Sequence, residues 1–223
     1  MSKKVVLERI QNALKRHSIS HQDIPYKNMI IDTKEDLLEE YKYYQDLNRA
    51  EVVDSNPENL LAEIENALAA FESQKLLYAT DLPCDLEALG GAYTKIPYDK
   101  PVEEFREEIF HIDTAILKAT CGVANLGMLG VVSSPASPRL TSLITLKCII
   151  LLEKSKIVRN LAQGLEALKK AGMPQDVKMR DEDCKHCLPT NMLLIGGPSR
   201  TADIELQTVF GVHGPMAVRV ILY

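Results

Sequence analysis

The chain has 223 residues and the composition of an ordinary globular protein, with 46% hydrophobic and 26% charged residues. This composition excludes a disordered or fibrous protein, and the length allows one substantial domain with a buried core. A formal net charge of -5 argues against a nucleic-acid-binding protein, because phosphate contacts need a basic surface.

Two amphipathic helices are predicted at the N-terminal end, over residues 3–15 and 34–47. Apolar residues recur at helical spacing in both, and a polar connection around Pro25 separates them. We expect residues 1–48 to form a helical extension that packs on a main α/β domain of residues 49–223.

From residue 50 onward, short β-branched runs alternate with helical stripes, which is typical of a βαβ sheet covered on both faces. The predicted strands are 50–53, 75–79, 93–96, 114–118, 128–132, 147–152, 191–195 and 217–223. The predicted helices run from about Pro57 to Phe71, over 102–109 and over 157–171. The sequence therefore predicts one α/β domain after the helical extension.

The most specific local feature is the segment Gly196-Gly197-Pro198-Ser199-Arg200-Thr201-Ala202-Asp203, which follows a predicted strand. Two glycines let a backbone approach a ligand, and the residues after them suit the start of a helix. A helix beginning here would point free N–H groups and its positive dipole end at an anion, and Arg200 could add bidentate recognition. The alternative is a tight turn before an ordinary helix, in which Asp203 and Glu205 complement the dipole.

Two further segments are candidates for the same site. Gly211-Val212-His213-Gly214-Pro215 places a histidine between glycines, where His213 is either a general acid or base or a residue that fixes a turn. The glycine-rich segment 119–130 follows a predicted strand, and open α/β sheets bind ligands in loops at the carboxyl ends of strands. We expect this segment to form the facing wall of a cleft.

Cys184, His186 and Cys187 lie in a Cys-x-x-Cys segment whose two sulfurs can reach one metal. The chain offers no second such pair, so a redox dithiol and a solvent-exposed loop stay open as interpretations. Apart from this candidate metal, no bound cofactor is predicted. Five cysteines, an odd number, suit reduced thiols, and we expect no membrane span, no signal peptide and a cytoplasmic protein.

Segments 196–205 and 211–215 together closely resemble the C-terminal signature of the lactate-utilisation protein C family, whose defining unit is the LUD domain. The similarity follows most of the chain in order and spacing. It implies a three-layer α/β/α sandwich of the kind shared with sugar-phosphate isomerases, CoA transferases and folate cyclo-ligases. It also implies a cytoplasmic role in the oxidation of L-lactate to pyruvate together with iron–sulfur partner proteins.

The chain departs from the family in its middle segment. Where the family pattern usually reads Gly-Ile-Ala-Glu-Thr-Gly-Thr, residues 122–128 keep the glycines but lose the carboxylate and both hydroxyls. Arg139 and Ser142 retain part of the following Arg-x-x-Ser-x-x-Pro pattern, with Thr145 at the proline position and Cys148 near an expected histidine. An active site that relies on the lost polar groups is altered or absent here.

The candidate ligand is a small carboxylate or phosphate. The predicted ligand-binding residues are Gly196, Gly197, Ser199, Arg200, Thr201, Asp203, Gly122, Asn125, Gly127 and Arg139, and the catalytic candidates are His213 and Glu205. The leading hypothesis is an anion-binding component of an L-lactate utilisation system. An autonomous enzyme on a phosphorylated or carboxylated metabolite (an isomerase, CoA transferase or cyclo-ligase) and a non-catalytic assembly subunit remain as alternatives.

Overall fold

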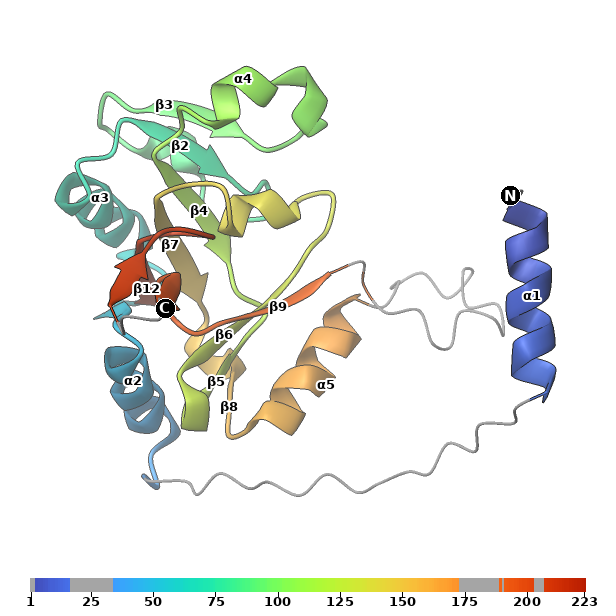
Figure 1. The fold of residues 1–223 in the computed structure, drawn as a ribbon. Coiled ribbons are helices and arrows are strands. Elements are labelled where there is room, and N and C mark those ends of the chain that lie inside the picture. Colours follow the sequence, from blue (N-terminus) through green and yellow to red (C-terminus); the bar gives the residue numbers. More distant parts are fainter. Residues whose placement is uncertain (1–2, 17–33, 173–188, 190, 203–206) are drawn as a thin grey trace.

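The computed structural model describes residues 3–16, 34–172, 189, 191–202 and 207–223 (Figure 1). Both N-terminal helices form, as α1 (Lys3–Arg16) and α2 (Leu37–Leu47). The side chain of Asp36 caps α2 by accepting a 2.8 Å hydrogen bond from the backbone N–H of Glu39. Helix α2 buries Tyr41 fully, so this helix belongs to the core of the main domain.

Six strands form a central sheet in which every pair is parallel, in the order β1-β12-β7-β4-β2-β3 (Figure 1). Their bounds are β1 Glu51–Asp54, β2 Lys75–Tyr78, β3 Thr94–Pro97, β4 Thr114–Lys118, β7 Lys147–Leu152 and β12 Ala217–Leu222. Parallel strands covered on both faces are expected to be continuously apolar, and the β7 sequence Lys-Cys-Ile-Ile-Leu-Leu fits that rule. The α/β class is confirmed.

Alternate residues of the central strands enter two different cores. Ile149 and Leu151 of β7 pack with helix α3 (Leu60–Ala70) on one face. Ile150 and Leu152 pack on the other face with Tyr41 of α2 and with a second, smaller sheet. This division follows from the two-residue period of a strand.

The smaller sheet has the order β8-β5-β6-β9 and mixes parallel and antiparallel pairs. Its strands are β5 Cys121–Val123, β6 Met128–Val132, β8 Ile157–Val158 and β9 Met192–Ile195. Helix α5 (Leu161–Gly172) packs against it so closely that a Cβ on Gly164 would lie 2.6 Å from a methyl group of Val123. The second face of the central sheet is therefore covered by strands as well as helices.

Several predicted boundaries are wrong. The predicted helix 157–171 begins with strand β8, because Ile157 and Val158 pair with β5 before α5 starts. Residues 102–109 divide into a 3-10 turn, η2 (Val102–Glu104), and the short helix α4 (Arg106–Ile109). Helix α3 begins at Leu60 after Asn59 rather than near Pro57.

The remaining short elements connect these layers. They are the 3-10 helices η1 Leu86–Ala88, η3 Ala124–Leu126, η4 Arg139–Ser142 and η5 Lys154–Lys156, and the strands β10 Arg200–Ala202 and β11 Thr208–Phe210. Within the described ranges, no helix is both long enough and apolar enough to cross a membrane.

Candidate functional site

The segment after Gly196-Gly197 forms a β-hairpin. Strand β10 pairs antiparallel with β11, and Arg200 lies directly opposite Phe210. The predicted helix start at Pro198 to Thr201 is therefore wrong, because residues 200–202 take their backbone partners from another strand. No helix dipole can therefore attract an anion at residues 200–202. Any anion site at this turn depends on side chains.

Gly197 serves close backbone packing. Its φ is +84°, and a Cβ at this position would lie 2.3 Å from the carbonyl oxygen of Asn48, at the end of α2. Gly127, with φ +55°, packs in the same way, since its Cβ would lie 2.4 Å from the carbonyl carbon of Tyr44. The Asn48 amide then donates to the carbonyl oxygens of Leu126 and Gly127, at 2.8 and 3.0 Å. Both predicted glycine segments thus meet at the C-terminal end of α2.

The segment around His213 also contacts the hairpin, at Ser199. The backbone N–H of Ser199 donates to Pro215 O at 2.8 Å, and its carbonyl accepts from Gly211 N at 3.0 Å. Its Oγ accepts a hydrogen bond from the backbone N–H of His213 at 3.3 Å, which leaves the exposed imidazole unused in this contact. The structure therefore brings the two C-terminal motifs together, as the sequence predicts.

Two guanidinium groups lie near this hairpin, one from the hairpin itself and one from the end of α2. Arg200 donates to the carbonyl of Gly196 at 3.1 Å. The guanidinium of Arg49 lies 6.0 Å from the ring centroid of Phe210, the residue directly opposite Arg200. Directly opposite residues of an antiparallel pair share one face, so both arginines belong to one patch. We call Arg49, Ser199, Arg200, Phe210 and His213 the hairpin surface.

Two residues of this surface, Phe210 and Arg49, were not predicted from the sequence. The φ of Arg49 is +63°, a left-handed conformation that is uncommon and strained for a residue with a side chain. It follows the last turn of α2, where its N–H donates to Asp46 O and the next N–H, of Ala50, donates to Gln45 O. Glycine is the usual residue at this position of a helix end, so an arginine there is a signal that sequence reading can use.

Of the other predicted site residues that the structure describes, Thr201 alone lies on the hairpin. Gly122 is buried in the core, where a Cβ would lie 2.8 Å from Leu152 and 3.0 Å from the Tyr41 ring. Asn125 is fully buried, and Arg139 is exposed at the start of η4. Thr201 is exposed on β10. The predicted residues Asp203, Glu205, Cys184, His186 and Cys187 lie outside the described residues.

A second group of polar side chains lies at the carboxyl ends of β2 and β4. The next strand of the central sheet after β2 is β3, on one side, and the next after β4, once the chain has passed through β5 and β6 of the smaller sheet, is β7, on the other side. The two adjacent strands therefore form a topological switch point. Open α/β sheets bind ligands in the crevice at such a point. The ammonium of Lys118 and Oδ2 of Asp81 are 3.0 Å apart across it.

A cavity of about 370 Å³ adjoins this point, lined by residues 78–80 and 82–86. Burial, followed by the charge of nearby Glu87, raises the pKa of the Tyr78 hydroxyl. Burial, followed by the charge of Asp85, raises the pKa of the Cys84 thiol. Both side chains are therefore neutral near pH 7, and Cys84 is not a thiolate nucleophile.

Together these observations define an open-sheet α/β domain with a polar hairpin surface at the amino ends of its parallel strands and a cavity at their carboxyl ends. Residues 2–223 match the family model of the LUD domain, and the chain belongs to the LUD domain family.

Named relatives agree with this assignment. The chain is 30% identical over 120 residues to Lactate utilization protein C of Exiguobacterium sp., covering 54% of this chain and 48% of that protein. It is 33% identical over 121 residues to an uncharacterized protein of Neisseria meningitidis serogroup B, covering 54% of this chain and 46% of that protein. The matched segments thus span about half the length of these relatives.

A crystal structure of a DUF162 family protein from Deinococcus radiodurans has a similar fold. The TM-score is 0.59 at 16% identity, over 83% of this chain and 95% of that one. At this identity the likeness concerns the fold alone.

Proposed function

We propose that this protein takes part in lactate utilisation by binding a small carboxylate or phosphate at the hairpin surface. Membership of the LUD family and relatives named Lactate utilization protein C support the process. The observation that carries the site is that Arg200 lies directly opposite Phe210 on the hairpin and that Arg49 lies over the Phe210 ring, beside Ser199 and His213.

The chemistry of the surface suits an anion. Arginine presents several N–H donors in a planar fork that matches a carboxylate or phosphate, and Arg200 uses one of its nitrogens on Gly196 O. The Ser199 hydroxyl and the exposed His213 imidazole add donors at the same loop. The Arg49 guanidinium lies over the Phe210 ring, which already restricts this long side chain in the absence of ligand. The conformational entropy that Arg49 loses on binding is therefore smaller.

Binding is the proposed role of this chain, within L-lactate oxidation that involves iron–sulfur partner proteins as the family resemblance implies. Gly122 to Met128 lack the family's carboxylate and hydroxyls, and Asn125 in this segment is fully buried. Residues 122–128 therefore contain no acidic side chain that could take part in catalysis.

The test of the site is ligand-induced stabilisation of the full chain by L-lactate, pyruvate and inorganic phosphate. Wild-type protein should gain melting temperature with at least one of these anions, and the double variant R49A/R200A should lose at least about tenfold in affinity, because charge-assisted hydrogen bonds are lost. Arg106→Ala, another exposed arginine, is the matched control and should bind as wild type does. Equal binding by R49A/R200A and wild type contradicts the site.

The test of the process is growth on L-lactate. Deleting the gene in its host should impair growth on L-lactate but not on glucose, and wild-type protein should restore it. Unchanged growth of the deletion strain contradicts the role in lactate utilisation, whereas rescue by R49A/R200A contradicts only the hairpin surface as its site.

A further inference from the structure

We propose that α1 binds an anionic lipid bilayer by lying along its surface. The helix stands apart from both sheets of the main domain (Figure 1). Its 14 residues span about 21 Å along the helix axis, which is shorter than the roughly 30 Å apolar core of a bilayer. The contact is therefore adsorption at the lipid surface and not a membrane span. It does not depend on the function proposed for the hairpin surface.

An apolar stripe runs along one side of α1. It is formed by Val6, Leu7, Ile10 and Ala13, which recur at the spacing of one helix face. Val6, Leu7 and Ile10 are 42%, 48% and 50% exposed, although residues of these types are usually buried. A helix of this length is marginal in water unless its apolar face packs against something. The stripe therefore needs a surface that covers it.

The charge of α1 is opposite to that of the rest of the chain. The helix holds five basic residues and one glutamate, a net charge of +4, in a chain whose formal total is -5, so all other residues together carry -9. Lys4 and Lys15 lie on one flank of the stripe, where their apolar stems can follow the lipid while their ammonium groups reach the headgroups. A basic amphipathic helix of this kind is typical of binding at an anionic lipid surface.

The acidic remainder of the chain does not prevent this contact. Residues 17–33 separate α1 from Lys34, the next residue that the structure describes. A chain of that length spans at most roughly 60 Å. Repulsion between exposed charges fades over about 8 Å at physiological ionic strength. Helix α1 can therefore reach a bilayer while the main domain lies beyond the range of the repulsion.

A protein surface is the alternative partner for the stripe. A cavity of about 490 Å³, partly lined by α5, has apolar residues such as Leu37 and Val158 in its wall. The same wall holds two basic residues, Arg159 and Lys170, against one acidic residue, Glu166. A helix with a net charge of +4 would meet like charges there. The charges therefore favour the lipid surface.

The experiment is co-sedimentation of the full chain with large vesicles. Wild type should bind equimolar phosphatidylglycerol–phosphatidylcholine vesicles at least about tenfold more tightly than vesicles of phosphatidylcholine alone. Binding should weaken as the salt concentration rises from about 0.1 M to about 1 M, because the screening length falls from about 10 Å to about 3 Å. Equal binding to the two kinds of vesicle, or binding to neither, overturns the proposal.

A matched pair of variants tests the stripe. Ile10→Gln removes an apolar side chain from the stripe without changing the charge, and it should weaken vesicle binding about tenfold. Val5→Gln makes the same kind of change at an exposed residue that lies away from the stripe, and it should change binding by less than about twofold. Equal losses in the two variants would mean that the stripe is not the contacting face, which refutes the proposal.

A second pair of variants tests the charge. The double variant K4Q/K15Q keeps the stripe and should weaken binding to the anionic vesicles at least about tenfold. The double variant K169Q/K170Q makes the equivalent change at two exposed lysines in the last turn of α5, and it should bind as wild type does. If K4Q/K15Q keeps full affinity, anionic headgroups are not what α1 recognises.

Sedimentation velocity without lipid tests the protein alternative. Wild type and Ile10→Gln should sediment as species of the same size. If wild type binds no vesicle but forms a dimer that Ile10→Gln dissociates, a second copy of the chain covers the stripe and the lipid contact is refuted. Ile10→Gln should leave anion binding at the hairpin surface unchanged, so the two proposals fail independently.

Discussion

Adjacent glycines at positions 196 and 197 meet very different surroundings. A Cβ on Gly196 would make ordinary contacts, at 3.8 Å from Met128 and 3.9 Å from Asn48. A Cβ on Gly197 would collide with Asn48 O at 2.3 Å, at a backbone φ of +84°. Only the second glycine is required by the junction between the hairpin and α2.

This difference predicts the effect of alanine at each position. Gly197→Ala should lower the free energy of unfolding by about 3 kcal/mol, from a left-handed alanine and a displaced Asn48. The melting temperature should then fall by roughly 6–12 °C. Gly196→Ala is the matched control and should change stability by less than about 1 kcal/mol. Equal losses in the two variants would show that the junction with Asn48 is not what requires Gly197.

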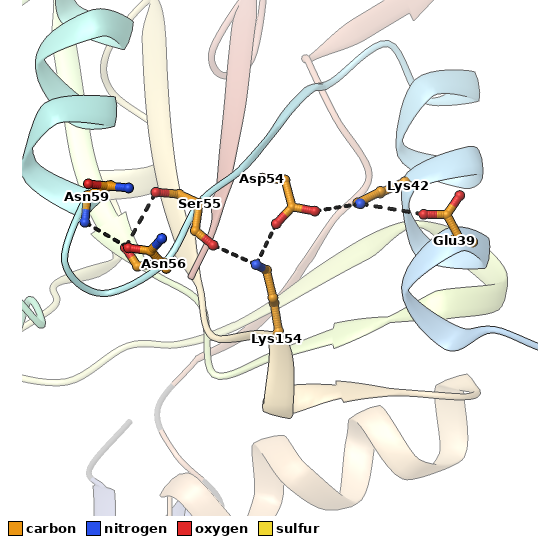
Figure 2. A network of polar contacts seen from close by, with 7 residues as sticks. All are labelled: Glu39, Lys42, Asp54, Ser55, Asn56, Asn59 and Lys154. Atoms are coloured by element: carbon orange, nitrogen blue, oxygen red, sulfur yellow. Dashed lines mark hydrogen bonds and ion pairs between the residues drawn. The ribbon is translucent and has the colours of Figure 1, made fainter.

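At the scale of elements, an ion-pair network ties α2 to the carboxyl edge of the central sheet (Figure 2). Asp54, the last residue of β1, contacts Lys154 through Oδ1 at 2.5 Å and Lys42 of α2 through Oδ2 at 2.6 Å. Lys154 also donates to Ser55 O at 2.5 Å. Helix α2 is therefore held by this network at its middle, through Lys42, and by Asn48 after its last turn.

The network makes stability depend on pH in a defined direction. Hydrogen bonds from Lys154 and then Lys42 lower the pKa of the Asp54 carboxyl below its ordinary 3.8. Its contribution is fully present above pH 3.8 and is lost as the pH falls through the lowered pKa. The hydrogen bond to Asp54 raises the pKa of Lys42 above 10.5, so that contribution is lost only as the pH rises past the raised value.

Asp54→Asn should therefore destabilise the protein by about 0.5–1 kcal/mol at pH 7, in the range of partly exposed pairs. The difference from wild type in chemical denaturation should persist at neutral pH and vanish in strong acid, where wild-type Asp54 is protonated too. Asp99→Asn, an exposed aspartate after β3, should show neither effect. A difference that grows toward acid would contradict the assigned direction.

At the scale of the whole molecule, the order of strands predicts where the fold is most stable. Strands β7 and β12 lie inside the central sheet, and residues 149–152 and 220–222 are fully buried between the two cores. Strand β3 is an edge strand that pairs with β2 alone. Sheet interiors open mainly by global unfolding, whereas edges open locally.

Hydrogen exchange read by peptide mass spectrometry should show this gradient. Amides of β7 and β12 should exchange slowest, with those of β3 at least about tenfold faster, because local opening of an edge costs less free energy. Exchange in β3 as slow as in β7 would mean that the sheet opens as one unit.

Several elements could be predicted from local sequence. Strands β4 and β7 have the predicted bounds, because runs such as Ile149 to Leu152 are buried on both sheet faces and are apolar throughout. The closeness of the Ser199 and His213 segments was also predicted, because the His213 segment directly precedes the terminal strand at the same sheet edge. The ligand assigned to them stays a prediction.

Pairing with distant residues decided the rest. Residues 200–202 and 157–158 became strands because partners elsewhere in the chain accept and donate their hydrogen bonds, and helical periodicity carries no record of those partners. The same holds for Lys118 and Asp81, which lie far apart in the chain and meet only because β4 lies next to β2. By itself the sequence determined the class of fold and many of its strands; only the tertiary structure decided which glycines pack closely and which side chains share a site, because neighbourhood in a sheet is set by strand order.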